Sequence, residues 1–144
     1  MLLDLTVSGN VTINASSEKV WNVLTNPEVI REYLFGTNTV TDWAVGSPIV
    51  FQGEYNGLKY RDHGEILTNV PLEKLSYSYW SNFTGLEDKP ENYSTVTYTI
   101  DSKGDDLTQF TWSQKGFANE DSCKHSQQNM SMMLNQIKAI AERE

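Results

Sequence analysis

The chain has 144 residues, of which 38% are hydrophobic and 11% aromatic. That is enough for one domain with a core, because a chain of this length buries roughly two-thirds of the surface that its unfolded form exposes. Acidic residues outnumber basic ones by 19 to 11, and the formal net charge of -8 disfavours nucleic acid and anionic membrane surfaces as partners.

Cysteine content and the start of the chain bear on the compartment. Cys123 is the one cysteine of the sequence, so no disulfide can form within the chain, which fits a reducing environment. Asp4 interrupts the apolar start, and no basic region precedes it. No apolar run approaches the ~18 residues that a membrane span needs. We therefore expect a cytoplasmic protein without a membrane partner.

The first part of the chain predicts a long strand followed by two short helices. Apolar residues alternate with polar ones from Leu3 to Ile13, with one gap at Gly9, which is typical of a strand with one buried face. Ser16 can cap the helix that follows. Pro27 ends that helix and starts a second one, since proline fits a first helical turn.

The middle of the chain predicts six further strands, and the end predicts a long helix. Alternating apolar positions mark the strands at about residues 39–43, 49–55, 58–68, 75–79, 96–100 and 110–112. Asn56-Gly57 predicts a tight hairpin turn between the second and third of these. After Gly116 the apolar residues recur at three- and four-residue spacing, so a helix follows, and Asn119 can cap it.

Several short segments, spread over most of the chain, together resemble a known family. They are residues 13–16, 20–21, 24–27, 64–66, 71–75, 96–98 and 116–117. In this order and spacing they resemble the START-like (SRPBCC) superfamily, which includes the birch-pollen allergens, and within it the family named for the activator of the heat-shock protein 90 ATPase. The resemblance implies one START-like domain over residues 1–144 with an α+β, helix-grip fold. In that fold a curved seven-stranded antiparallel sheet wraps around the long C-terminal helix, and a pocket lies between them.

Residue types for metal binding or nucleophilic catalysis are sparse. The metal ligands of the usual nitrogen and sulfur types are His63, Cys123 and His125, and the last two are two positions apart on a predicted helix, so they point in different directions. Asp62 and His63 are neighbours on a strand and therefore lie on opposite faces. We predict no metal site, no cofactor and no catalytic residue, and we expect His63 to face solvent.

Asp62 is the carboxylate of greatest interest. Its strand parity matches that of Tyr60, Gly64 and Ile66, which we assign to the concave face of the sheet. A carboxylate in that position could act as an acid or a base. The alternative, which we favour, is a position near the rim of the sheet with access to water.

Aromatic residues with polar tips form the stronger candidate site. Tyr77, Tyr79, Tyr98 and Trp112 have inward parity on three strands, and Tyr33 on the second helix could act as a lid. Such rings suit an amphipathic small molecule, although an ordinary aromatic core would show the same pattern. The predicted ligand-binding set combines these residues with the inward stripe of the last helix: Tyr33, Phe51, Asp62, Tyr77, Tyr79, Tyr98, Phe110, Trp112, Ser126, Met130, Met133 and Leu134.

Three functions remain open at this point. The leading one is a non-catalytic domain, monomer or homodimer, that binds a small apolar or amphipathic molecule. The resemblance implies two others: an accessory protein with the heat-shock protein 90 chaperone as its partner, and a polyketide-cyclase-like enzyme that uses Asp62 and the tyrosines as acid–base groups. A pocket blocked by side chains would favour the chaperone function, and a buried Asp62 beside a tyrosine would favour the enzyme.

Overall fold

The structure is a computed structural model that describes residues 2–34, 36–55, 57–81 and 85–143, without the side chain of Tyr55. The described residues form these elements in chain order: β1 (Leu3–Ile13), α1 (Ser17–Thr25), α2 (Pro27–Tyr33), β2 (Asn38–Val40), β3 (Pro48–Tyr55), β4 (Leu58–Val70), β5 (Lys74–Tyr79), the short 3-10 helix η2 (Pro90–Asn92), β6 (Ser94–Gly104), β7 (Leu107–Phe117) and α3 (Glu120–Ala141).

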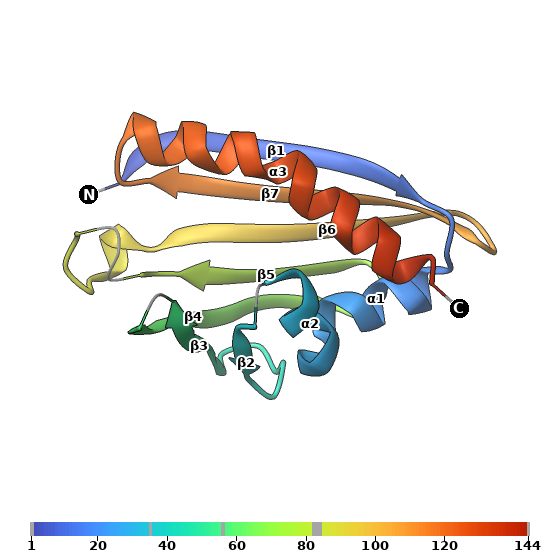
Figure 1. Cartoon of the computed structure of the whole chain (residues 1–144), viewed down its shortest axis with the longest axis horizontal. Coiled ribbons are helices and arrows are strands. Elements are labelled where there is room, and N and C mark those ends of the chain that lie inside the picture. Colours follow the sequence, from blue (N-terminus) through green and yellow to red (C-terminus); the bar gives the residue numbers. More distant parts are fainter. Residues whose placement is uncertain (1, 35, 56, 82–84, 144) are drawn as a thin grey trace.

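The strands form one antiparallel sheet with the order β1-β7-β6-β5-β4-β3-β2. One face of this sheet, called the inner face below, is covered by helices. Figure 1 shows α3 running over β1 and β7, with α1 and α2 beside the C-terminal end of α3. The α+β, helix-grip architecture predicted from the sequence is confirmed.

The helices begin where side chains can accept hydrogen bonds from their first turns. Ser16 Oγ accepts from the backbone N–H of Lys19 at 3.2 Å, and Asn119 accepts from the backbone N–H of Ser122 at 2.8 Å. Asn26 caps α2, whose first residue is Pro27. The predicted helix starts are therefore confirmed.

The strand boundaries differ from the predicted ones, most clearly in β6 and β7, which extend beyond residues 96–100 and 110–112 at both ends. β2 ends at Val40 rather than at residue 43, and Trp43 has a φ of 67°, which an extended strand does not allow. β4 continues to Val70 because it pairs with β5 as far as Lys74. In the predicted hairpin turn, Gly57 has a φ of 80°, and Asn56 lies outside the described residues.

Gly9, the gap in the apolar alternation of β1, lies where α3 crosses the strand. A Cβ atom at this position would lie 2.8 Å from Met130 Cγ and 2.9 Å from Leu134 Cδ1. The missing side chain therefore lets the helix approach the strand.

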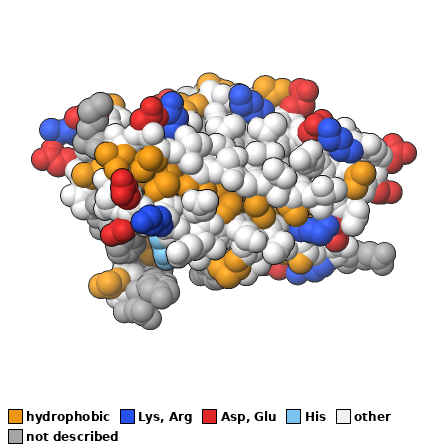
Figure 2. Space-filling model, turned by 90° about the horizontal axis from the view of Figure 1, so that it is seen from above, with side chains coloured by type: hydrophobic (Ala, Val, Ile, Leu, Met, Phe, Trp, Pro, Cys, Tyr) orange, Lys and Arg blue, Asp and Glu red, His pale blue; other side chains and the backbone are white. Residues whose placement is uncertain are grey.

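Seen from above, Figure 2 shows a patch of hydrophobic side chains at the end where β1 begins and a narrower strip that continues toward the middle of this face.

The close-packed core lies where α1, α2 and the second half of α3 meet the sheet. Ten of its described members have exposed fractions of 1% or less: Ile13, Val20, Leu24, Tyr33, Ile49, Ile66, Leu75, Phe110, Ile137 and Ala141. In the described ranges, no helix combines the length and the apolar character that crossing a membrane requires.

Candidate functional site

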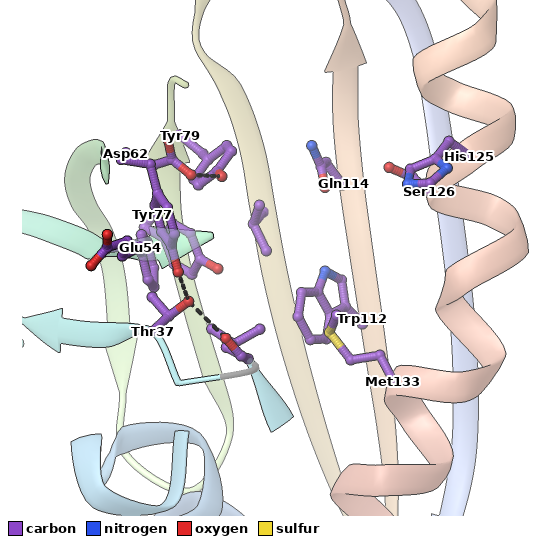
Figure 3. Close-up of a pocket in the computed structure, with 14 residues that line it drawn as sticks. Thr37, Glu54, Asp62, Tyr77, Tyr79, Trp112, Gln114, His125, Ser126 and Met133 are labelled. Carbon is purple, nitrogen blue, oxygen red and sulfur yellow. Dashed lines mark hydrogen bonds between the residues drawn. The ribbon is translucent and has the colours of Figure 1, made fainter. Parts of the chain in front are cut away.

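A cavity of about 610 Å³ lies between the inner face of the sheet and α3. Figure 3 shows its two walls, one formed by β3, β4 and β5 and the other by β7 and α3. The lining residues are Leu34, Thr37, Phe51, Glu54, Tyr60, Asp62, Tyr77, Tyr79, Val96, Trp112, Gln114, His125, Ser126 and Met133.

Strand register places the sheet residues of the cavity in rows. Tyr77 is the cross-strand partner of Val96, and Val96 is the partner of Gln114 on β7. On the other side, Phe51 of β3 is opposite Asp62 of β4. Directly opposed residues share one face of a sheet, so these side chains converge on one space.

Asp62 is a buried carboxylate in the wall of the cavity. Its exposed fraction is 7%, and the hydroxyl of Tyr79 donates a hydrogen bond to its Oδ2 atom at 2.5 Å. The other carboxylate oxygen, Oδ1, is also buried and has no hydrogen-bond partner among the described residues. The favoured interpretation of Asp62 as a water-accessible residue at the rim is therefore wrong, because neighbouring side chains cover this part of β4.

The environment of Tyr79 keeps its hydroxyl protonated. Burial raises the pKa of Tyr79 far above its ordinary value, and the negative charge of Asp62 and the hydrogen bond to it raise that pKa further. The Tyr79 hydroxyl is thus a donor to Asp62 at any physiological pH.

Tyr77 and Tyr98 form a second hydroxyl pair beneath the cavity. Their oxygens are 2.9 Å apart. Burial raises the pKa of Tyr77 to about 12, and burial together with the neighbouring Tyr77 raises the pKa of Tyr98 well above its ordinary value. The two rings also meet edge to face, with centroids 5.8 Å apart.

Seven of the twelve predicted ligand-binding residues line this cavity: Phe51, Asp62, Tyr77, Tyr79, Trp112, Ser126 and Met133. The other five lie outside its lining. Phe110 and Tyr98 are core residues on the inner face, and Met130 and Leu134 pack beside Gly9 on β1.

Tyr33 does not form a lid over the cavity. It is 1% exposed, and its hydroxyl donates to the backbone oxygen of Val23 at 3.2 Å. Its ring instead borders a separate void of about 10 Å³ in the core. The short helix α2 turns this side chain inward, toward α1, rather than toward the cavity mouth.

Sequence reasoning missed several lining residues. Gln114 has the same strand parity as Trp112 and could have been found by extending that pattern by two residues. Thr37 lies between α2 and β2, where no periodic pattern exists, and its hydroxyl is 2.5 Å from that of Tyr60. His125 precedes Ser126 on α3, and its residue type alone suggests a metal ligand rather than a lining residue.

His63 lies on the outer face of the sheet, as its parity predicted, but a loop covers it. Its side chain is 24% exposed, its Nε2 atom is 3.2 Å from a carboxylate oxygen of Asp88, and its ring lies against that of Trp80. Among the described residues, no group of three or more His, Cys, Asp or Glu side chains is placed to hold a metal ion.

The antiparallel sheet, the long C-terminal helix and the cavity between them define a START-like domain. The chain belongs to the family described as activator of Hsp90 ATPase homolog 1-like protein, whose family model matches residues 14–142. It is similar to the solution structure of ChR145 from Cytophaga hutchinsonii, with 41% identity over 99% of this chain and 97% of that chain and a TM-score of 0.82.

Two more distant structures share the fold. The Aha1 dimer from Colwellia psychrerythraea is 15% identical over 96% of each chain, with a TM-score of 0.74. An Hsp90 activator from Plasmodium falciparum is 17% identical over 94% of this chain and 95% of that chain, with a TM-score of 0.72. No curated protein sequence matches the chain.

Proposed function

We propose that this chain is a small-molecule-binding domain whose ligand occupies the cavity between the sheet and α3. The observation that carries the proposal is the size of the cavity, about 610 Å³, which lies in the roughly 300–1,000 Å³ range typical of ligand sites. Aromatic and aliphatic side chains make up much of its wall, and a few polar groups converge on it. This composition suits an amphipathic molecule, whose apolar body and polar group need different partners.

The open cavity favours this function over an accessory role in the Hsp90 chaperone system. The side chains that the structure describes leave open the space between the sheet and the first half of α3. Hsp90 activation appears in the name of one distant structural relative, and dimer formation in that of another. A chaperone partner and a homodimer therefore remain hypotheses for this chain, separate from ligand binding.

Trp112 offers a direct test of ligand binding. Its ring lines the cavity and lies 4.8 Å from that of Tyr98, measured between ring centroids. We expect amphipathic probes, such as long-chain fatty acids and flavonoids, to quench the tryptophan fluorescence and to raise the melting temperature with increasing concentration. A Trp112→Phe variant should stay folded and lose most of the quenching.

Trp80→Phe is the matched control, because Trp80 packs on His63 and does not belong to the cavity lining. This variant should keep the response to the probes. A broad amphipathic library that neither quenches fluorescence nor stabilises the wild-type protein would contradict the proposal.

Acid–base catalysis in the same cavity is a second candidate, favoured by the buried Asp62 beside Tyr79. Native mass spectrometry of the purified protein can identify a ligand that co-purifies with it. That ligand is then incubated with wild-type protein and with an Asp62→Asn variant, and its structure is compared. A chemical change that only the wild-type protein produces would support the enzyme, and an unchanged ligand would contradict it.

A further inference from the structure

We infer that the cavity takes a ligand with an apolar body and a protonated amine, and that Asp62 binds the amine. This inference rests on the proposed function, since it specifies the chemistry of a ligand in the same cavity. It depends on three features of the described residues: an unpaired carboxylate oxygen, the charge of the lining, and the rings around Asp62.

The unpaired oxygen indicates a hydrogen-bond donor in the ligand. Tyr79 satisfies Oδ2 of Asp62, whereas Oδ1 is buried without a partner in the described part of the chain. A buried acceptor without a partner destabilises the folded protein, and the cost is larger when the acceptor is charged. Because the Asp62 side chain lines the cavity, a donor that enters the cavity can remove this cost.

The charge of the lining favours a cationic donor over a neutral one. The carboxylates of the lining are Glu54 and Asp62, and within the described residues the lining holds no Lys or Arg. Among the described lining residues, His125 is the one imidazole, and it lies on the opposite wall, on α3 (Figure 3). A carboxylate in a partly buried site attracts an ammonium group more strongly than a hydroxyl, and it repels another carboxylate.

Aromatic rings near Asp62 add a second attraction for an ammonium group. Phe51 is the cross-strand partner of Asp62, and its ring centroid is 5.8 Å from that of Tyr79 and 5.4 Å from that of Tyr77. Ring faces attract a nearby cation, and the attraction grows when water is excluded. A carboxylate beside grouped aromatic rings is therefore suited to an amine attached to an apolar body.

Three probes with the same body and different end groups can test this inference: phenylbutylamine, phenylbutanol and phenylbutyrate. Isothermal titration calorimetry at neutral pH measures their dissociation constants with the wild-type protein. We expect the amine to bind about tenfold more tightly than the alcohol, the magnitude of one charged hydrogen bond. The carboxylate probe should bind most weakly, because it meets Asp62 and Glu54.

Asp62→Asn keeps the shape of the side chain and an oxygen that can accept from Tyr79. In this variant we expect the affinity for the amine to fall about tenfold, to that of the alcohol, with the alcohol unchanged. Glu65→Gln is the matched control, because it also removes one carboxylate from β4, but from an exposed position outside the cavity lining. It should change the affinity for the amine less than about twofold.

The outcomes separate this inference from the proposed function. If none of the three probes binds the wild-type protein, the proposed function fails. If the alcohol binds and the amine binds no more tightly, the cavity is a ligand site and the amine inference is wrong. This second comparison needs only wild-type protein, so it decides the matter even if Asp62→Asn does not fold. Equal losses in Asp62→Asn and Glu65→Gln would also overturn the inference, since the net charge of the protein would then explain the preference.

Discussion

The two halves of α3 cover the same sheet but bury very different amounts of surface. The second half places Leu134, Ile137 and Ala141 against the other elements, with exposed fractions of 4%, 0% and 1%. In the first half, from Glu120 to Met133, no side chain is buried. One helix thus closes the core at its C-terminal end and borders a cavity at its N-terminal end.

Residue size and anchoring explain the difference. Ser126, on the first half, places a small hydroxyl toward the cavity (Figure 3), whereas Ile137 fills its part of the core. Near the C-terminal end, Lys138 Nζ donates to the backbone oxygen of Thr12 at 2.7 Å, and the backbone N–H of Asn14 donates to a carboxylate oxygen of Glu142 at 2.7 Å. A helix can therefore be fixed at one end and leave space for a ligand at the other.

Truncation of one apolar residue in each half should give the largest contrast. Ile137→Ala removes a fully buried side chain and should cost about 2–5 kcal/mol of unfolding free energy. Met133→Ala should cost about 1 kcal/mol or less, because its side chain already borders empty space. Urea unfolding of both variants measures the difference, and equal losses would mean that α3 is packed uniformly.

Alkaline pH should lower the unfolding free energy, because buried tyrosines lie where the packed core meets the cavity. The pKa of Tyr77 is raised from 10.0 to about 12 in the folded protein, so the unfolded chain loses this proton first. The stabilisation that results from this pKa difference is complete below about pH 10 and is lost between about pH 10 and pH 12. For Tyr77 alone the loss is roughly 2–3 kcal/mol.

Unfolding free energies measured in urea across the alkaline range test this expectation. Tyr77→Phe removes the ionisable group and should make stability fall less steeply with rising pH than in the wild-type protein. Wild-type and Tyr77→Phe curves that run parallel would contradict a role for Tyr77.

The sequence predicted which face of the sheet a strand residue lies on better than it predicted which residues are buried or line the cavity. Period-two alternation assigned Asp62, Tyr98, Phe110 and Trp112 to the inner face, and the structure places all four on it. Parity does not say where along a strand the cavity ends. Phe110 and Trp112 share one parity, yet Phe110 lies in the core outside the lining, whereas Trp112 lines the cavity. The burial of Asp62 depends on residues distant in sequence, and no local pattern contains that information.

The smallest expected effect comes from enlarging an inward residue in the open half. Ser126→Leu should fill part of the cavity, so the unfolding free energy should change by less than about 1 kcal/mol while the affinity for phenylbutanol falls. Ala141→Leu is the matched control in the closed half, where a 1% exposed residue leaves no room and the extra methylenes should cost about 1–3 kcal/mol. If Ser126→Leu is destabilised as much as Ala141→Leu and still binds the probe, the space in front of Ser126 is filled and the ligand site lies elsewhere. A stable Ser126→Leu variant that has lost the probe would instead locate the site between the first half of α3 and the sheet.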